Sequence, residues 1–298
     1  MTERDEATGN DGKNRFVDWF RSADWFDPFN LTFWDIAPTI QMHIDKAVVA
    51  RSYVTGSDEH LESRPEVLLT SPGARSGLAM LLRRGEEQTE LIGWWPFTTE
   101  GVQLSVEVEG VDRDATGRQG IVHGVVGDEL ALSWYDPLYA VDGSAYAPGA
   151  RLEMALTGFA HDVVYGSAPP MIIEPGTRAF DNLTRGIGRE PPDGPIEIKM
   201  EGMAAVMPIP DAPPNYYEVR GPVTSVEPYT GWLFDRKAWA VRAVVARIGE
   251  TNNTDIELEL LITDHVLGSR PPPPIGSDIA AVIRLQGRIW MRSAPNRR

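Results

Sequence analysis

The stretch IELELLITDHVLGSRPPPPIGSDIAAVIRLQGRIW, residues Ile256–Trp290, contains the clearest structural pattern in the chain. Apolar and polar residues alternate at its start, as in a β-strand with one buried face, and the alternation ends at Asp264-His265. Four prolines and Gly276 follow and predict a rigid connection, because proline fixes φ and donates no backbone hydrogen bond. An apolar strand then ends at Gly287. The stretch therefore predicts a strand, a sharp turn, a stiff connection and a second strand.

The same order of features occurs once before, in LALSWYDPLYAVDGSAYAPGARLEMALTGFA, residues Leu130–Ala160. An alternating strand ends at Asp136, a Pro-Gly pair follows about a dozen residues later, and an apolar strand ends at Gly158. Two interpretations fit: a duplicated unit, or two antiparallel meanders that agree by chance. A structural corner would recur in both copies, so the parallel between Asp136 and Asp264 favours turn formation over catalysis for these aspartates.

Further strand patterns precede each copy and are separated by glycine-containing turns. Residues 103–108 and 121–126 precede the first copy, and residues 216–219 and 239–248 precede the second. Four or five antiparallel strands at regular spacing are typical of a small barrel or sandwich. We predict a mainly β protein with two tandem small antiparallel β-barrels, OB-like or sandwich in type, and an aromatic-rich, partly helical N-terminal region.

Composition shifts divide the chain into five parts. The first 14 residues are acidic and contain glycine and asparagine, which predicts disorder, and the middle of the chain has repeated proline and glycine pairs. The predicted parts are a disordered tail (1–14), an N-terminal α+β region (15–98), a first small β-barrel (99–167), a Pro/Gly-rich linker (168–215) and a second small β-barrel with an arginine-rich tail (216–298).

The N-terminal region is unusually aromatic. Eight of its aromatic residues fall within a short segment: Phe16, Trp19, Phe20, Trp25, Phe26, Phe29, Phe33 and Trp34. The segment either packs as an arm over the chain's own β-structure or forms an exposed patch that docks a partner. Further along, residues 78–82 could pair with residues 89–95 as a hairpin, whereas the good helix formers in LAMLL favour a helix.

Composition also excludes several classes of function. The 298-residue chain has no cysteine, so it has no disulfide, thiolate zinc site, iron–sulfur cluster or cysteine nucleophile. No run approaches the roughly 20 apolar residues of a membrane-spanning helix. The polar N-terminus lacks the apolar core of a secretory signal, so we expect a cytoplasmic protein with no membrane contact.

No catalytic or metal-binding motif is complete. The five histidines include no i, i+4 pair for a helical zinc site, and residues 112–117 begin like a calcium loop that lacks its final glutamate. Residues 73–77, GARSG, are one position out of register with a nucleophile elbow. We therefore expect no cofactor, no metal site and no catalytic residue. An enzyme would need several polar residues to converge in one pocket: His123, His161, His265, Asp136 and Asp264.

The net charge of −15 works against contact along a phosphate backbone, yet five arginines and no acid occur from Arg284 onward. Basic and aromatic residues together are typical of single-strand binders. The candidate binding residues are Trp239, His265, Arg284, Arg288, Trp290 and Arg292. We favour a non-enzymatic interaction protein, an acidic inhibitor or assembly component with a protein partner of complementary charge. Single-stranded nucleic-acid binding and a hydrolase with an unfamiliar site are the alternatives.

The ending P-x-x-x-G-S-D-I-x-x-x-I-x-L-Q-G-x-I-W, residues Pro272–Trp290, resembles the C-terminal strand of bacterial proteins of uncharacterised function. The resemblance covers about 20 residues. It implies a shared β-structure and a bacterial source, and it transfers no activity or catalytic residue. Ala280, Ala281 and Arg284 depart from the pattern inside the strand.

Overall fold

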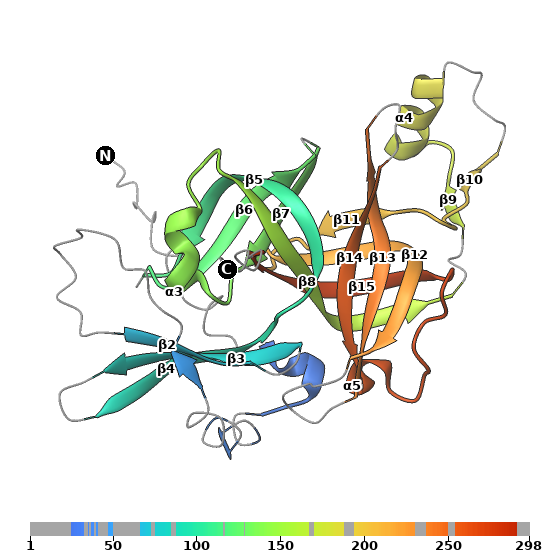
Figure 1. Ribbon diagram of the computed structural model, residues 1–298. Helices are drawn as coiled ribbons and strands as arrows, with labels where there is room; N and C mark the ends of the chain where they lie inside the picture. Colours follow the sequence, from blue (N-terminus) through green and yellow to red (C-terminus); the bar gives the residue numbers. More distant parts are fainter. Residues whose placement is uncertain are drawn as a thin grey trace, which may run out of the picture.

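The protein is mainly β, as predicted (Figure 1). The computed structural model describes residues 25–32, 35, 37–38, 40, 47–49, 66–72, 75–84, 88–115, 117–127, 129–166, 170–187, 194–229, 237–249 and 254–290. The predicted disordered tail and Arg292 lie outside these residues.

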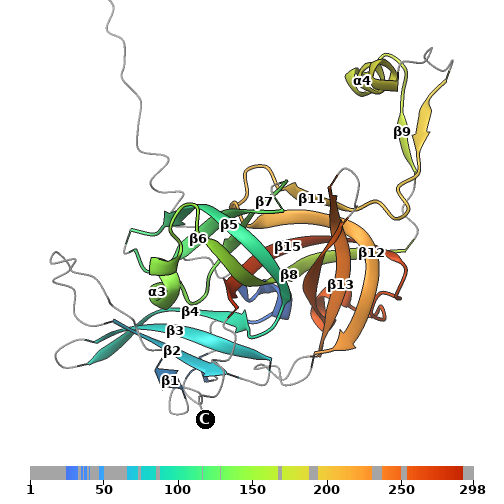
Figure 2. The same ribbon diagram turned by 45° about the horizontal axis from the view of Figure 1, so that its top comes forward.

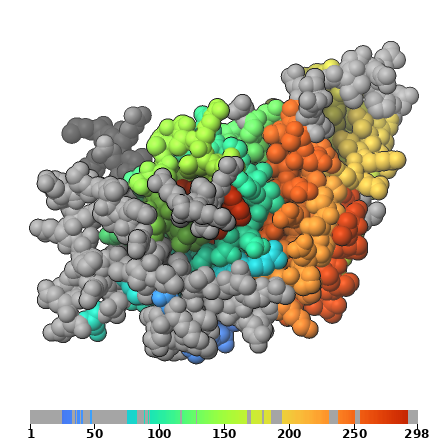
Figure 3. Space-filling model, viewed as in Figure 1, coloured from blue at the N-terminus to red at the C-terminus, as the bar shows by residue number. Residues whose placement is uncertain are grey.

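Each of the two stretches, Leu130–Ala160 and Ile256–Trp290, joins the two strands that precede it in a group of four strands, with a short helix before the last strand. The first group is β5 (Val102–Arg113), β6 (Gly120–Val126), β7 (Leu130–Tyr135), α3 (Tyr139–Asp142), the 3-10 helix η3 (Gly143–Ala145) and β8 (Arg151–Tyr165). The second is β12 (Tyr216–Pro228), β13 (Ala238–Ile248), β14 (Thr254–Thr263), α5 (Asp264–Leu267) and β15 (Asp278–Ile289). Figure 3 shows the two groups side by side, the first in green and the second in orange.

One mixed sheet contains both groups of strands, in the order β11-β12-β13-β14-β8-β15-β7-β6-β5, where β11 is Ala205–Pro208. β8 and β15 pair antiparallel along almost their whole lengths. β8 also pairs with β5 and, in parallel, with β14, whereas β15 also pairs with β12 and, in parallel, with β7. The pairings therefore form two closed circuits, β5–β6–β7–β15–β8 and β12–β13–β14–β8–β15, which share two strands.

The turns before β8 and β15 have the same hydrogen bonds. The N–H groups of Gly149 and Gly276 donate to the carbonyls of Val108 and Val223, at 2.7 and 2.8 Å. These two valines in turn donate to the first residues after the glycines, at 2.8 and 2.9 Å. The φ angles of Gly149 and Gly276 are +81° and +83°, a conformation that side chains disfavour, so glycine is required at both.

The expectation that Gly158 and Gly287 end their strands is wrong, because both lie inside β8 and β15. Gly158 pairs with Leu285, and Gly287 pairs with Leu156. A Cβ at Gly158 would lie 2.7 Å from the Ile283 side chain, and one at Gly287 would lie 2.4 Å from Trp134. The two glycines therefore make room for core side chains rather than marking strand exits.

The sharp turn expected at Asp264-His265 is the start of the short helix α5. The Oγ of Thr263 caps it by accepting a hydrogen bond from the N–H of Val266. His265 is exposed on this helix.

The segment predicted as a linker contains secondary structure of its own. It includes β9 (Met171–Ile173), α4 (Arg178–Ile187), β10 (Ile196–Ile198) and β11. β9 and β10 form a separate two-stranded antiparallel sheet. Together with α4 this sheet projects from the body of the protein, as Figures 1 and 2 show from two directions.

The N-terminal region forms a four-stranded antiparallel sheet of β1 (Val48–Val49), β2 (Glu66–Pro72), β3 (Ser76–Arg84) and β4 (Thr89–Thr98). The predicted hairpin is confirmed, because β3 is a strand rather than a helix and pairs with β4. Its core positions, including Leu78 and Met80, are fully buried. Burial against neighbouring strands has here outweighed the helix propensity of the sequence.

Three aromatic residues of the N-terminal segment pack on the large sheet beside the 3-10 helix η2 (Asp27–Phe29). The ring centroid of Trp25 lies 4.9 Å from that of Tyr135, and those of Trp25 and Phe29 each lie 6.1 Å from Phe159. Phe26 is buried in the same cluster. This part of the segment therefore packs on the chain's own β-structure. The other aromatic residues of the segment lie outside the described residues.

Asp136 is a buried corner residue, 1% exposed, at the end of β7. The hydroxyl of Tyr146 donates to its Oδ2 and the N–H of Leu138 donates to its Oδ1, both at 2.7 Å. Burial raises the pKa of Asp136 to about 7, with a further rise from Asp142 and an opposing effect of Arg288. Its carboxyl group is therefore partly protonated near neutral pH.

We predict that stability falls as the pH rises from about 4 to about 7. In this window the unfolded chain releases the Asp136 proton while the folded protein retains it, because the folded pKa is about 7 and the ordinary value is 3.8. The loss should be on the order of 1–4 kcal/mol, since one pKa unit corresponds to about 1.4 kcal/mol. Asp136→Asn imitates the protonated carboxyl, so the variant should lack this part of the pH dependence in urea unfolding. If the free energy of unfolding changed equally with pH in the wild type and the variant, the raised pKa of Asp136 would be contradicted.

Candidate functional site

The outer face of β15 is covered along one half and open along the other. Arg284 is 1% exposed, and its guanidinium stacks on Trp25, with 3.4 Å between Cζ and the ring centroid. Gln286 is equally buried and donates to the carbonyl of Pro96 in β4, at 2.7 Å. From Asp278 to Val282 the outward side chains are instead partly exposed. The covered half of β15 contacts the N-terminal region through Trp25 and Pro96, and the open half is partly exposed.

Strand register places eight side chains in two rows that cross the open half of β15 and its neighbouring strands. Directly opposed residues of antiparallel strands point to the same face. The first row across β11, β12, β15 and β8 is therefore Ala205, Arg220, Ala280 and Val164. The second row, two residues along each strand, is Met207, Glu218, Val282 and Asp162.

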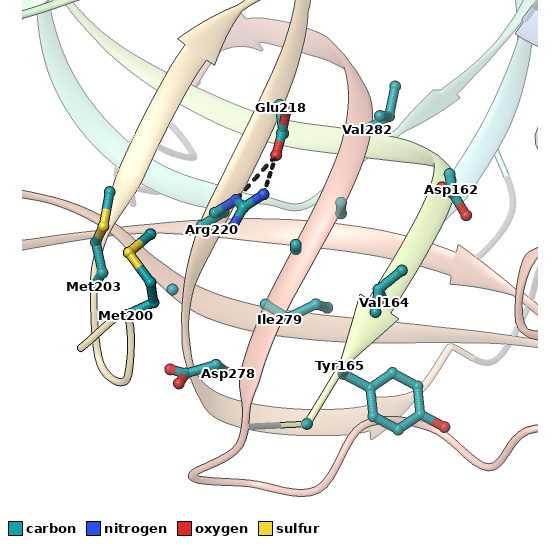
Figure 4. Close-up of a pocket in the computed structure, with 14 residues that line it drawn as sticks. Asp162, Val164, Tyr165, Met200, Met203, Glu218, Arg220, Asp278, Ile279 and Val282 are labelled. Carbon is teal, nitrogen blue, oxygen red and sulfur yellow. Dashed lines mark hydrogen bonds and ion pairs between the residues drawn. The ribbon is translucent and has the colours of Figure 1, made fainter. Parts of the chain in front are cut away.

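A cavity of about 460 Å³ lies over this face (Figure 4). β8, β12 and β15 supply its floor, and the small Ala280 leaves room at the centre. A turn from Met200 to Met203 forms one wall, with the side chains of both methionines on the same side of the cavity in the figure. Val164 lines the opposite side. The volume is within the usual range of ligand sites, roughly 300–1,000 Å³.

Acidic groups dominate the polar lining of the cavity. Its charged residues are Asp162, Glu218, Asp278 and Arg220, which gives a formal charge of 1 − 3 = −2. Arg220 Nη2 and Nε donate to Glu218 Oε1 at 2.8 and 2.9 Å. Both side chains are more than one third exposed, so solvent screening leaves this ion pair little weight in stability. The arrangement suits a ligand that carries positive charge beside apolar groups.

Asp278 fixes the methionine wall to the floor of the cavity. The N–H of Gly202 donates to Oδ1 and Oδ2 of Asp278, at 3.0 and 3.1 Å. Gly202 lies between the two methionines with φ at +72°, and its carbonyl accepts from Arg247 Nη1 at 2.9 Å. The turn is closed by a hydrogen bond from the Met203 N–H to the Met200 carbonyl, at 3.1 Å. Asp278 thus binds the N–H of Gly202 in this turn, and Arg247 binds its carbonyl.

The candidate binding residues that the structure describes, which are all of them except Arg292, do not line this cavity. Trp239 packs against the core from β13, and Trp290 donates its backbone N–H to the Glu153 carbonyl at 2.7 Å. Arg288 donates to the carbonyl of Thr99, and burial lowers its pKa. The role of these residues in binding stays a prediction.

Sequence reasoning missed the cavity residues. The signal was the opposite charges of Glu218 and Arg220 two positions apart in a strand, because such residues share one face. Met200 and Met203, beside a glycine between two strand patterns, were the second signal.

A Ser-His-Asp row lies on another face, across β5, β6 and β7. The Oγ of Ser133 lies 2.8 Å from His123 Nδ1, and His123 Nε2 lies 3.0 Å from Asp112 Oδ2. If Nε2 donates to the aspartate, Nδ1 can accept the serine proton, as in a nucleophile–base pair. The Tyr217 hydroxyl accepts the Ser133 N–H at 2.7 Å, and burial raises the pKa of Tyr217. Of the five polar residues expected to converge in an enzyme, none lines the cavity.

Within the described part of the chain, no group of three or more histidine, cysteine or acidic side chains is arranged to hold a metal ion. Nor is any helix among those residues both long and apolar enough to span a membrane.

Comparison with protein-family models, curated proteins and solved structures found no match in any of the three.

We predict that Asp278→Ala loosens the methionine wall. The Gly202 N–H is shared between the two carboxylate oxygens, and loss of this bifurcated hydrogen bond should lower the free energy of unfolding by about 1–2 kcal/mol and speed amide exchange at Gly202. Asp162→Ala is the matched control, because it removes a carboxylate from the same cavity without touching Gly202. Urea unfolding measures the free energy in both variants, and hydrogen exchange followed by mass spectrometry measures the exchange at Gly202. Unchanged exchange at Gly202 in Asp278→Ala would show that the wall is held by other contacts.

Proposed function

We propose that this is a non-enzymatic binding protein that holds a positively charged, partly apolar group of its partner in the cavity over β8, β12 and β15. The observation that carries the proposal is the combination of a cavity of about 460 Å³ with three carboxylates and one arginine in its lining. Complementary charge speeds encounter and disfavours wrong partners, so an acidic site selects cationic groups. The overall charge of −15 acts in the same direction over longer distances.

We further propose that the two groups of strands are duplicated barrels joined through β8 and β15. The support is the pair of closed circuits and the matching hydrogen bonds at Gly149 and Gly276. A cytoplasmic location and a bacterial source remain part of the proposal, and a chain without cysteine suits a reducing compartment.

The first test uses two short peptides, acetyl-Leu-Arg-Leu-amide and acetyl-Leu-Glu-Leu-amide, with protein labelled at the methionine methyl groups. We expect the arginine peptide to shift the NMR signals of Met200 and Met203 and the glutamate peptide to leave them unchanged. Asp162→Asn should weaken binding roughly threefold to fivefold, because a partly exposed charge pair contributes about 0.6–1 kcal/mol. Glu174→Gln removes an exposed acid elsewhere and should have no such effect. Methionine signals that respond to neither peptide would refute the proposed site.

Hydrolysis through Ser133 is a second candidate, favoured by the Ser133–His123–Asp112 distances. A fluorophosphonate probe should then attach to the Ser133 Oγ, with the serine proton passing to His123 Nδ1 and fluoride leaving. His123→Ala should slow this labelling at least tenfold, whereas replacing the exposed Ser105 should not change it. Mass spectrometry of tryptic peptides locates the label. An unlabelled Ser133 at high probe concentration removes this candidate.

A further inference from the structure

The face that carries the cavity continues onto β11, beyond the residues that line the cavity. Met207 opposes Glu218 in the β11–β12 pair, so its side chain lies on the same face as the cavity. Met207 is 39% exposed, Met203 is 36% exposed and Val164, at the far side, is 60% exposed. Apolar side chains thus lie at both edges of the face, and Asp162 lies on the same strand as Val164.

The width of this face suits one helix. Four adjacent strands, β11, β12, β15 and β8, span three intervals of about 4.8 Å, or about 14 Å. An α-helix with its side chains is about 10–12 Å across. A helix can therefore lie on the four strands with one face against them, whereas an extended peptide would cover only part of the width.

The chemistry of the face favours an amphipathic and basic helix. Methionine is unbranched and polarizable, and it adapts to apolar side chains of different shapes. Met203 and Met207 lie on the same side of the acidic centre, four residues apart along the wall and β11. In the second row, Met207, Glu218, Val282 and Asp162 alternate apolar and acidic groups. A complementary surface has apolar side chains that meet Met207 and Val282, and lysine or arginine that meets Glu218 and Asp162.

We infer that the partner is a protein segment that forms a basic amphipathic helix and lies over β11, β12, β15 and β8, with its axis along the strands. The inference rests on the proposed function, because a basic side chain of the helix occupies the cavity, beside Glu218 and Asp162. Its apolar side chains contact Met203, Met207 and Val164. The mode of recognition is a helix in a shallow groove, read through apolar residues at i, i+3, i+4 and i+7.

The test compares two fluorescein-labelled peptides of 18 residues with the same leucine and lysine content. One has leucine at helical spacing, and the other has the same residues in scrambled order. Fluorescence anisotropy at low salt should give the amphipathic peptide a dissociation constant at least tenfold lower than the scrambled one. A glutamate-for-lysine version of the amphipathic peptide should not bind.

Variants outside the cavity separate this inference from the proposed function. Met207→Gln removes the apolar contact without changing the charge of the face, so it should weaken the amphipathic peptide at least fivefold. It should leave the shifts caused by acetyl-Leu-Arg-Leu-amide unchanged, because Met207 does not line the cavity. Ile172→Gln is the matched control, since Ile172 is 60% exposed on the projecting β9.

If the tripeptide shifts are observed, the proposed function stands, and three results would then overturn the inference alone. They are equal binding of both long peptides, no binding of either, and a Met207→Gln variant that binds as wild type. Binding of the glutamate version would assign an anionic partner instead. Absence of tripeptide shifts at Met200 and Met203 would remove the proposed function itself.

Discussion

The antiparallel pairing of β8 with β15 holds the two groups of strands in one sheet. Each of these strands also pairs with two further strands, so both circuits close through the same two segments. Gly158 and Gly287 keep the pair free of side chains where Ile283 and Trp134 pack from the interior. A register shift between Val282 and Ile283 marks a bulge in the middle of the pair. Bulges bend strands and change the direction of side chains, and here the bulge lies where the covered half of β15 gives way to the open half.

The division of β15 into two halves explains why similar residues have different roles along one strand. Beyond the bulge, Arg284 lies under Trp25, where the loss of hydration is offset in part by the contact of the guanidinium with the aromatic ring. Before the bulge, Asp278 is partly exposed and orders the turn at Gly202. The described part of the N-terminal region thus covers one half of the face, and the cavity lies over the other half.

Local sequence patterns predicted the strands well and their partners poorly. The alternation in residues 103–108 identified β5, since a half-buried strand has a period of two residues, and the polar turn before residues 121–126 helped to identify β6. The parallel pairing of β7 with β15 joins Tyr135 to Gln286, and no short-range pattern encodes such a contact. Gly158 and Gly287 were misread because a glycine that ends a strand and one that makes room for a neighbour look alike in sequence. The cavity escaped prediction because Asp162, Glu218 and Asp278 come from three segments that only the register of distant strands brings together.

The shared strands also affect the order in which the protein can form. β5, β6, β7 and β8 are complete early in synthesis, but their circuit closes only through β15, near the end of the described chain. Until β15 emerges from the ribosome, β7 and β8 each have an edge with unpaired backbone groups, which is the kind of surface that promotes aggregation. Contacts so distant in sequence also slow folding, because loop closure precedes the energy gained from the contact. The first group of strands therefore has unpaired edges for longer during translation than a self-contained domain of its size would.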